Sequence, residues 1–445
     1  MSVVFWFRKD LRLQDHPALN LALDSGEDVY LVATADQVGS PFLSLSDLRQ
    51  NSLRASWRSL MDSLSSKLTI LQKPTDLIAF AEAQGISKVF ASAAFDTNGR
   101  REISAIAKDL LGNGVELVLG PGNYAVEPGA VRKADGTPYR VYTPFFNEWH
   151  KQPSLEPILC SDLSRVQEGV GSSFDANLQL GSSIEAGEGF AVKTLETFLD
   201  NRVMDYSNHR NRADLGGTSH LSHALSHGEI HPRTILARLP AGSGGAEVFR
   251  KEIAWREFYA DVLWHNPETL TDYLNEGFAA MRYDQDEIRI QAWREGNTGY
   301  PMVDAGMRQL SSTGWMHNRV RMIVASFLVK DLHVEWQVGA RWFEENLTDF
   351  DPASNSHGWQ WTAGCGTDAS PYYRVFNPVL QGLKFDPNGD YVRKYVPELR
   401  HLEGSKAHEP WEEEFGFKFG YPERLVDHAT ERIESLARLD ELKAN

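Results

Sequence analysis

The sequence predicts an α/β domain with a doubly wound, Rossmann-like parallel sheet, followed by an all-helical domain. Three observations favour this class. Short apolar runs alternate with helical periodicity from the N-terminus to about residue 125. Strand signals nearly vanish after residue 190, where amphipathic helical patterns follow one another. Nine of the twelve tryptophans follow residue 250, which indicates that the chemistry belongs to the helical part.

The N-terminal part is predicted to alternate strands with helices. The expected strands are the apolar runs at residues 3–7, 29–34, 68–71, 88–91 and 116–119. The expected helices between them cover residues 17–23, 43–65, 75–84 and 100–111. Such alternation is typical of a parallel sheet with helices on both faces. No GxGxxG motif follows the first strand, so the usual dinucleotide fingerprint is not supported there.

The periodicity divides the chain into three parts. Residues 1–130 form the α/β domain, residues 131–189 form an inter-domain connector, and residues 190–445 form the helical domain. The connector is predicted because residues 152–189 are rich in Ser, Gly and Glu and show little periodicity. The helices expected after it cover residues 192–206, 246–263, 302–311, 318–332, 339–347 and 423–443.

The composition limits the class of protein. A 42% hydrophobic fraction over 445 residues predicts a globular chain of two or three domains. Charges interrupt the first apolar run, and no run approaches the roughly 18 apolar residues of a membrane span, so we expect neither a signal peptide nor a membrane segment. Only Cys160 and Cys365 are present, which fits a reducing cytoplasm. The formal net charge of −16 lowers the expectation of DNA binding, although one basic groove can still exist.

The segment 346–376 is the most informative part of the chain. It combines polar Asn, Ser and Gly with aromatic residues and shows neither helical nor strand periodicity. We therefore expect polar turns in which Asn355, Trp359 and Trp361 hold a planar, hydrogen-bonding cofactor. Taken singly, each tryptophan of this part could equally fill a helical core.

Residues 216–222 carry two glycines followed by hydroxyl side chains, just before a helical run. Free backbone N–H groups at a helix start form a natural phosphate cradle, although an ordinary Gly-rich turn with a Ser/Thr cap explains the same pattern. Histidines at helical spacing also suggest a metal site, but no acidic or cysteine ligand completes the set and Gly228 interrupts the helix. A metal is therefore not expected. These histidines are His220, His223, His227 and His231.

Two helical segments place polar groups beside aromatic or sulfur side chains. Glu252 and Trp255 stand three residues apart on one helix face, where a carboxyl and an indole could together bind a flat partner. Asn318, Arg321 and Met322 likewise share one side of a second helix. A solvated Glu beside a core Trp, and a plain core helix with flanking charges, remain alternatives for the two segments.

Together, these segments closely resemble the DNA photolyase/cryptochrome family, and most closely class I cyclobutane pyrimidine dimer (CPD) photolyases. The resemblance runs along nearly the whole chain and includes VVFWFRKDLRLQDHPAL, EIAWREFYADVLWHNP, NTGYPMVDAGMRQL, GWMHNRVRM, DFDPASNSHGWQW and RVFNPVLQG. It implies an N-terminal antenna domain and a helical domain that binds FAD, active as reduced FADH⁻. It also implies a monomer that acts on UV-damaged DNA, with methenyltetrahydrofolate or an 8-hydroxy-5-deazaflavin as a second, antenna chromophore.

The resemblance assigns roles to individual residues. Arg321, Asp349 and Asp351 resemble residues that line the flavin, and Asn355 stands where the family faces flavin N5. Trp336 and Trp359 resemble the first members of the photoreduction chain. Residues that resemble the FAD phosphate site are Tyr206, Thr218, Ser219, His220, Leu221 and Ser222. Residues that resemble the lesion pocket or phosphate contacts are Glu252, Trp255, Asn318, Met322, Trp361, Arg210, Arg256, Arg319 and Arg374.

The chain departs from the family pattern in three places. Tyr283 stands where many relatives carry the outermost tryptophan of the photoreduction chain, so Tyr283 or a displaced tryptophan could end it. His357 replaces a common glycine or asparagine, and His223-Ala224 replaces a Pro-Tyr. A cryptochrome-like photoreceptor and a (6-4) photolyase remain alternative functions, although Asn355, Asn318 and Met322 favour CPD repair. A helical binding protein with a tryptophan-rich core is the remaining possibility.

Overall fold

The computed structural model describes residues 2–35, 45–153, 156–170, 184–368 and 373–444. The chain forms two compact units. Unit 1 comprises Met1–Met204 and Ser219–Pro267, and unit 2 comprises Asp205–Thr218 and Glu268–Asn445. The predicted boundaries at residues 130 and 190 differ from this division and stay predictions.

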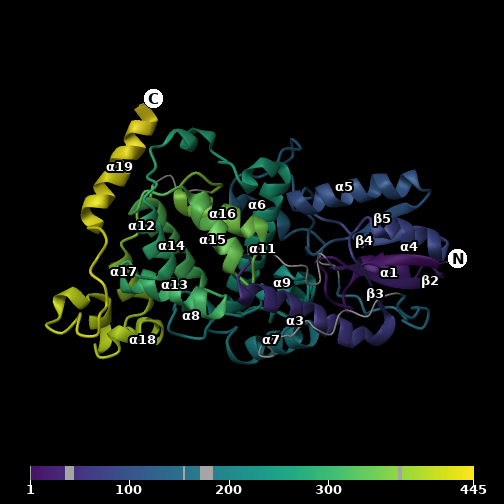
Figure 1. Cartoon of the computed structure of the whole chain (residues 1–445), viewed down its shortest axis with the longest axis horizontal. Helices are drawn as coiled ribbons and strands as arrows, with labels where there is room; N and C mark the ends of the chain where they lie inside the picture. The colour runs from purple at the N-terminus through teal and green to yellow at the C-terminus, as the bar shows by residue number, and fades with distance from the viewer. Residues whose placement is uncertain (1, 36–44, 154–155, 171–183, 369–372, 445) are drawn as a thin grey trace. The chain divides into compact units, whose positions relative to one another are not determined.

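A five-stranded parallel sheet forms the centre of unit 1 (Figure 1). Its order is β3-β2-β1-β4-β5, so the chain starts in the middle of the sheet and winds outward in both directions. This confirms the predicted fold class and all five predicted strands. The strands are β1 (Ser2–Trp6), β2 (Asp28–Thr34), β3 (Leu68–Leu71), β4 (Ile86–Ser92) and β5 (Glu116–Gly120).

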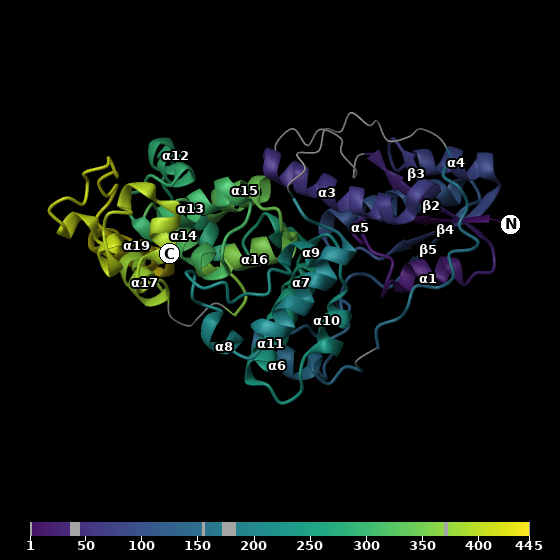
Figure 2. The same cartoon turned by 90° about the horizontal axis from the view of Figure 1, so that it is seen from below.

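Successive side chains of the central strand point to opposite faces of the sheet, and each face has its own core. Val3 and Phe5 pack with helices α1 (Pro17–Leu23) and α3 (Asp47–Leu64). Val4 and Trp6 pack with the helices α4 (Asp76–Gln84) and α5 (Thr97–Gly112) on the other face. Figure 1 shows α5 above the strands and α3 below them, and Figure 2 gives the view from below. The predicted start of α3 at residue 43 lies outside the described residues.

The helices that follow the sheet in unit 1 are anchored to the strand-end loops by a buried carboxylate. Glu257 of α11 is 1% exposed. It accepts hydrogen bonds from the backbone N–H groups of Ala125 and Val126 at 2.6 and 3.0 Å and from Trp149 Nε1 at 2.6 Å. The arrangement fixes the rotation of α11, the helix that carries Glu252. These helices are α6 (Tyr142–Trp149), α7 (Glu188–Asn201), α9 (Ser222–Ser226), α10 (Pro232–Arg238) and α11 (Gly244–His265).

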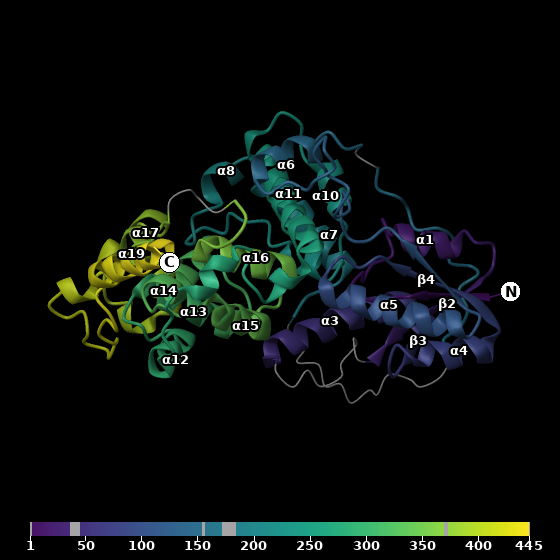
Figure 3. The same cartoon turned by 90° about the horizontal axis from the view of Figure 1, so that it is seen from above.

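Unit 2 is helical, and α13 to α16 pack around one hydrophobic core (Figure 3). Its α-helices are α8 (Tyr206–His209), α12 (Glu287–Glu295), α13 (Pro301–Thr313), α14 (Asn318–Lys330), α15 (Trp336–Asn346), α16 (Pro352–Ala363), α17 (Pro378–Phe385), α18 (Asp390–Tyr395) and α19 (His428–Ala444). The short 3-10 helices of the chain are η1 (Ser65–Lys67), η2 (Pro267–Leu270), η3 (Glu276–Ala280), η4 (Pro397–Leu399), η5 (Gly404–His408) and η6 (Pro410–Glu412).

The expectation of polar turns over residues 346–376 was wrong for its centre, which forms helix α16. Asp351 caps this helix by accepting a hydrogen bond from Ser354 N at 2.8 Å, and Pro352 occupies its first turn. Gly364 ends it in the left-handed conformation with φ +95°. The helix shows no apolar periodicity because most of its faces are buried, and its ends are set by the cap residues. Residues 369–372 of the predicted segment lie outside the described residues.

Two predicted helix boundaries also differ. The helix expected over residues 192–206 ends at Asn201, because the N–H groups of Arg202 and Val203 both turn back to Phe198 O. Tyr206 instead begins the separate helix α8. The helix expected from residue 423 starts at His428, where Asp427 Oδ1 accepts from Thr430 N at 2.9 Å and caps it.

No helix within the described residues is both long and apolar enough to cross a membrane. Cys160 is half-buried and Cys365 is buried, and both are free thiols.

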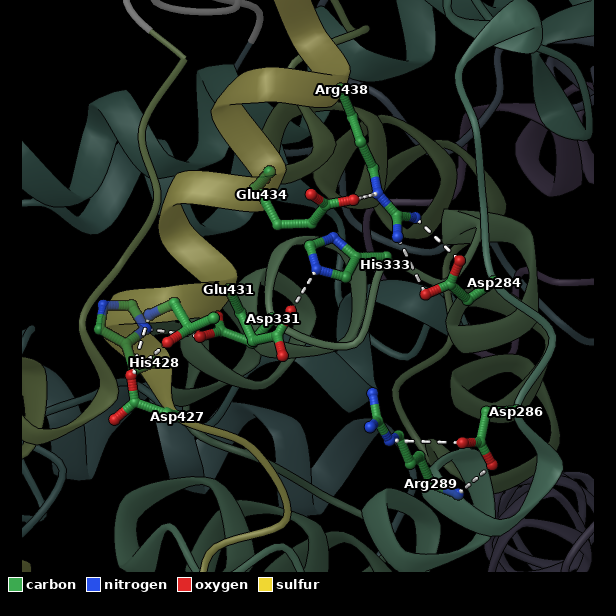
Figure 4. Close-up of polar contacts among 12 residues, drawn as sticks. Asp284, Asp286, Arg289, Asp331, His333, Asp427, His428, Glu431, Glu434 and Arg438 are labelled. Carbon is green, nitrogen blue, oxygen red and sulfur yellow. Dashed lines mark hydrogen bonds and ion pairs between the residues drawn. The ribbon is translucent and has the colours of Figure 1, made fainter.

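Ion pairs hold helix α19 against the 282–284 and 331–333 segments (Figure 4). His428 pairs with Asp331, and His333 Nε2 lies 2.8 Å from Glu431. Burial raises the pKa of the Asp331 carboxyl to about 6. Arg438 Nη1 lies 3.0 Å from Asp284 Oδ1 on the neighbouring segment. These contacts fasten α19 at both ends.

Replacing Arg438 should loosen α19. Arg438 is 6% exposed and also donates to Arg282 O, so Arg438→Met leaves that backbone carbonyl and the Asp284 carboxylate without this donor. Hydrogen bonds to charged groups contribute about 1.5–3 kcal/mol, which sets the expected loss. Hydrogen exchange of the α19 amides should become faster by a corresponding factor. The matched control Lys443→Met, in an exposed pair of the same helix, should leave exchange nearly unchanged, and equal exchange in both variants would contradict the assigned role.

Candidate functional site

An ion pair between α14 and the turn before α16 forms the centre of the predicted site in unit 2. Arg321 Nη2 donates to Asp349 Oδ2 at 2.7 Å, and Arg321 Nε donates to Met316 O at 2.8 Å. Asp349 is 6% exposed, and its other oxygen, Oδ1, is buried without a hydrogen-bond donor among the described residues. Two of the residues expected to line the flavin, Arg321 and Asp349, are therefore an ion pair. A buried acceptor without a donor is costly unless a ligand satisfies it.

Asn355 lies one turn into α16, with its side-chain amide held in one orientation. Its Nδ2 donates to Ala340 O of α15 at 3.0 Å. A backbone carbonyl can only accept, so the NH₂ group must face Ala340. The Asn355 Oδ1 then lies at the opposite end of the carboxamide, where it can accept a hydrogen bond. The carboxylate of Asp351 caps α16, by accepting from Ser354 N, rather than forming an ion pair.

Trp359 and Trp336 are buried indoles of neighbouring helices, 2% and 1% exposed. A Cβ at Gly339 of α15 would lie 2.1 Å from Trp359 Cη2, so only glycine lets α15 approach this ring. Trp359 of α16 also packs edge-on against Phe343 of α15, with ring centroids 5.0 Å apart. Neither indole Nε1 makes a hydrogen bond with a described residue. The two rings are therefore held in the core by packing contacts.

The remaining predicted residues of unit 2 lie at or near its surface. Asn318 is exposed at the first position of α14, whereas Met322 and Trp361 are half-buried. Arg319 donates twice to Asn211 Oδ1, at 3.2 and 2.8 Å, and lies over the Phe385 ring. The Asn211 partner has no sequence signal, because it lies more than a hundred residues away.

Arg374, Tyr206, Arg210 and Thr218 complete the predicted set in unit 2. Arg374 is exposed, and its carbonyl accepts a hydrogen bond from the buried Lys330. Tyr206 is 7% exposed, and the Arg210 guanidinium lies 5.9 Å from the centroid of its ring. Thr218 is half-buried at the end of the 216–218 turn.

In unit 1, helix α11 presents Glu252 and Trp255, both half-buried, at the predicted spacing of three residues. The structure adds a partner that the sequence did not indicate. Tyr142 of α6 stacks on Trp255 with ring centroids 3.7 Å apart and an interplanar angle of 8°. Tyr142 is fixed in turn because its hydroxyl donates to Lys251 O at 2.7 Å. One face of the Trp255 indole is thus occupied by protein.

Arg256, predicted to contact phosphate, is engaged within unit 1. It donates to Asn123 O at 3.0 Å and to Leu225 O at 3.4 Å, and it lies over the Tyr124 ring. These contacts favour a role in holding the loop that follows β5. Its role in phosphate binding stays a prediction.

The polar turn before α9 contains the other predicted phosphate ligands. His220 adopts a left-handed conformation with φ +57°, which is uncommon for a residue with a side chain. Ser219 Oγ accepts from Leu221 N at 3.3 Å, and Ser222 is the first residue of α9. The turn predicted ahead of a helix is present, and its contact with phosphate stays a prediction.

The histidines of this region are used within the fold of unit 1. The rings of His223 and His227 stack with centroids 4.3 Å apart, and His223 contacts Ser52 and Ser56 of α3 at 3.2 Å each. His231 caps α10 by accepting from Arg233 N at 3.1 Å. No group of three or more potential ligands suited to a metal ion occurs within the described parts of the chain.

The residues of unit 2 fit the expected flavin. The buried Asp349 Oδ1 can accept from a cofactor N–H or O–H group, and the available end of Asn355 is also an acceptor. Arg321 supplies positive charge beside them. A flavin ring carries both N–H donors and carbonyl acceptors, so this donor and acceptor set suits it.

Comparison with known proteins identifies both parts of the chain. Residues 3–162 match the family model described as DNA photolyase, and residues 249–441 match the model described as FAD binding domain of DNA photolyase. Over 471 aligned residues, the chain is 36% identical to the deoxyribodipyrimidine photo-lyase of Alkalihalophilus pseudofirmus, covering 97% of this chain and 96% of that protein.

Solved structures agree over the full length. A class III photolyase from Agrobacterium tumefaciens matches with a TM-score of 0.93 and 36% identity, covering 100% of this chain and 98% of that one. An archaeal photolyase from Sulfolobus tokodaii, described with two FAD molecules, has a TM-score of 0.87 and 27% identity, with coverages of 99% and 100%. A Synechocystis cryptochrome matches with a TM-score of 0.87, 27% identity and coverages of 98% each. The chain therefore belongs to the DNA photolyase family.

Proposed function

We propose that this protein is a light-driven deoxyribodipyrimidine photo-lyase that binds FAD and splits cyclobutane pyrimidine dimers in UV-damaged DNA. The observation that carries the proposal is the pair of half-buried Arg321 with buried Asp349, whose second oxygen is an unused acceptor among the described residues. It lies within the part of the chain that matches the FAD-binding family model. FAD in its reduced form supplies the single electron that light drives into the dimer.

In this proposal, the residues of unit 2 bind and orient the flavin. Arg321 and Asp349 hold its polar ring edge, and Asn355 accepts from the flavin nitrogen that it faces. The Ala340 carbonyl prevents the Asn355 amide from turning, so the acceptor end stays toward the cofactor. Tyr206 and the residues of the 218–222 turn hold the phosphates. Buried Trp359 and Trp336 exclude water and carry electrons to the flavin when it must be reduced.

Polar and aromatic groups hold the lesion in this proposal. Glu252 and Asn318 donate or accept hydrogen bonds at the dimer carbonyl and amide edges, which favours the extra negative charge that the dimer gains. Trp255 and Trp361 stack the bases that leave the duplex, and Tyr142 stiffens Trp255 from behind. Met322 fills the apolar space beside them, while Arg210, Arg319 and Arg374 are the proposed phosphate contacts.

A second, antenna chromophore is part of the proposal. The Sulfolobus tokodaii photolyase, with its two FAD molecules, supports such a site in this family, and methenyltetrahydrofolate or an 8-hydroxy-5-deazaflavin are the proposed occupants here. We further propose a cytoplasmic monomer, in agreement with the two free cysteines.

One assay tests the function. Reduced, flavin-loaded protein should restore the bases of CPD-containing oligonucleotides under blue light and leave (6-4) photoproducts intact. Conversion of the (6-4) lesion alone would assign the protein to the other repair class. A lack of conversion of either lesion would contradict the proposed repair activity and favour a photoreceptor, the alternative suggested by the similar Synechocystis cryptochrome.

Removing the Glu252 carboxylate should lower repair but not flavin binding. We expect Glu252→Ala to reduce the number of dimers split per absorbed photon by roughly two- to tenfold, which corresponds to about 0.4–1.4 kcal/mol at the branching step. The reason is the loss of one hydrogen bond to the charged dimer. Glu247→Ala provides a matched control, because Glu247 lies in the first turn of the same helix and pairs with Arg250. Equal yields in the two variants would remove Glu252 from the lesion site.

Replacing Asp349 should weaken flavin retention. Asp349→Asn keeps the size of the side chain but leaves Arg321 without its negative partner, which costs about 1–3 kcal/mol for a partly exposed arginine. The flavin-to-protein absorbance ratio after gel filtration should fall. The exposed pair Asp390–Arg393 supplies the control Asp390→Asn, which should retain the wild-type ratio. Full flavin occupancy of the Asp349→Asn protein would argue against the proposed contact.

A further inference from the structure

A chain of aromatic rings leads from Trp336 toward the surface of unit 2. The Tyr273 ring meets Trp336 edge-on, with centroids 6.1 Å apart and an interplanar angle of 90°. Tyr283 then stacks on Tyr273 at 6.4 Å and 23°. These separations are those of rings in direct contact. An electron can pass along such a contact without a further mediator.

The hydrogen bonds of these rings differ in a way that matters for oxidation. The Trp336 Nε1 makes no hydrogen bond with a described residue. The Tyr273 hydroxyl donates to Glu335 Oε1 at 3.2 Å. The Tyr283 hydroxyl donates to the backbone carbonyl Phe278 O at 3.2 Å. Of the three rings, only Tyr273 thus donates to a carboxylate, which can accept a proton.

We propose that Tyr273, with Glu335 as its proton acceptor, is the terminal electron donor that returns an oxidised Trp336 to its neutral form. This inference rests on the proposed function, because it needs the flavin to oxidise Trp359 and Trp336 in turn after light absorption. It assigns the end of the photoreduction chain to Tyr273 and not to Tyr283, the residue at the position where relatives carry the outermost tryptophan.

The step balances as follows in electrons and protons. The Trp336 radical cation takes one electron from Tyr273 and becomes the neutral indole. The O–H bond of Tyr273 breaks at the same time, and its proton forms an O–H bond with Glu335 Oε1. The products are a neutral tyrosyl radical and a protonated Glu335. An external thiol then gives a hydrogen atom to the tyrosyl oxygen, its own sulfur radicals couple to a disulfide, and Glu335 returns its proton to water.

The burial of the phenol makes the carboxylate essential. Desolvation, together with the nearby Glu335 charge, raises the pKa of the Tyr273 phenol to about 12, while contacts with Tyr283 and Gln337 offset part of the rise. The phenolate is therefore absent at neutral pH, and the electron can leave only together with the proton. Burial also raises the pKa of Tyr283, whose carbonyl partner cannot take up its proton. Tyr283 is consequently the poorer donor.

Glu335 is placed to connect this step with solvent. It directly precedes Trp336, at the N-terminus of α15, and is half-buried, whereas Tyr273 is 7% exposed. Because Glu335 and Trp336 are consecutive residues, the electron acceptor and the proton acceptor of Tyr273 move together. The electron transfer to Trp336 and the proton transfer to Glu335 therefore depend on the same local geometry.

The test is the identity of the radical formed in flavin-loaded, oxidised protein under blue light without thiol. Freeze-quenched EPR of the wild type should show a tyrosyl signal whose hyperfine pattern changes when tyrosine is ring-deuterated. Tyr273→Phe should lose this signal and leave a longer-lived tryptophan radical. The matched variant Tyr283→Phe should keep it. Loss of the signal in Tyr283→Phe with retention in Tyr273→Phe would overturn the assignment, as would a wild type that accumulates only tryptophan radicals.

Glu335→Gln tests the proton acceptor separately. The amide can still accept the hydrogen bond but cannot take up the proton, so decay of the tryptophan radical should slow, and the solvent deuterium isotope effect of the wild type should be lost. Unchanged decay and an unchanged isotope effect would exclude Glu335. The wild type and the variant are compared at equal flavin content, because flavin retention shows that the variant is folded.

Failure of this inference is distinguishable from failure of the proposed function. Chemically reduced wild-type protein needs no photoreduction, so its repair of CPD-containing DNA reports on the proposed function alone. Repair together with an unaltered radical in Tyr273→Phe would refute only the assignment of Tyr273.

Discussion

The ion pair between Arg321 and Asp349 is the contact on which the geometry of the unit 2 site depends. It joins α14 to the turn from which α16 starts, at an N–O distance of 2.7 Å. A buried carboxylate must be paired, since an isolated one is strongly destabilising. Asp351, two residues further on, begins α16 by capping it. One short turn thus fixes both the charge of the site and the direction of the helix that carries Asn355 and Trp359.

Close packing supplies the second constraint. Gly339 lets the Trp359 ring lie against α15, and the Ala340 carbonyl beside it holds the Asn355 amide. The ring and the amide are therefore positioned by consecutive residues of one helix. A side chain at residue 339 would push Trp359 away from α15 and would therefore shift α16, the helix that carries Trp359. The polar and aromatic parts of the site are consequently set by the same helix contact.

The sequence predicted the sheet and most helices because these follow from local signals. Apolar runs bounded by turns gave all five strands, and periodicity gave the principal helices of both units. Helix α16 was missed because its polar residues are buried and satisfied at long range. Ser356 Oγ donates to Thr269 O at 2.5 Å, and Gln360 Oε1 accepts from Leu274 N at 2.8 Å. Polarity there indicated buried hydrogen bonds, not turns.

The sequence offered candidate members of the site, which stay predictions, but not their pairings. Helical spacing and the family resemblance proposed Glu252, Trp255, Arg321 and Asp349 as candidates. Their neighbours come from distant segments, such as Tyr142 on Trp255 and Asn211 on Arg319. Spacing along one helix cannot reveal a partner a hundred residues away, because tertiary packing alone brings the two together.

The hydrogen bonds of the aromatic residues in unit 2 separate electron transfer from proton transfer, two functions that redox proteins must combine. Trp336 and Trp359 are buried, and neither indole N–H donates to a residue that the structure describes, so in the proposed chain these two rings exchange electrons and no described neighbour takes up their protons. Tyr273 lies in contact with Trp336 and is bonded to a carboxylate. In the proposed chain, electrons therefore move through the core without proton transfer, and the proton is released at Tyr273, whose acceptor Glu335 is half-buried. If a proton acceptor were buried beside either indole, the oxidised tryptophan would lose its proton there, and the radical would be trapped inside the protein.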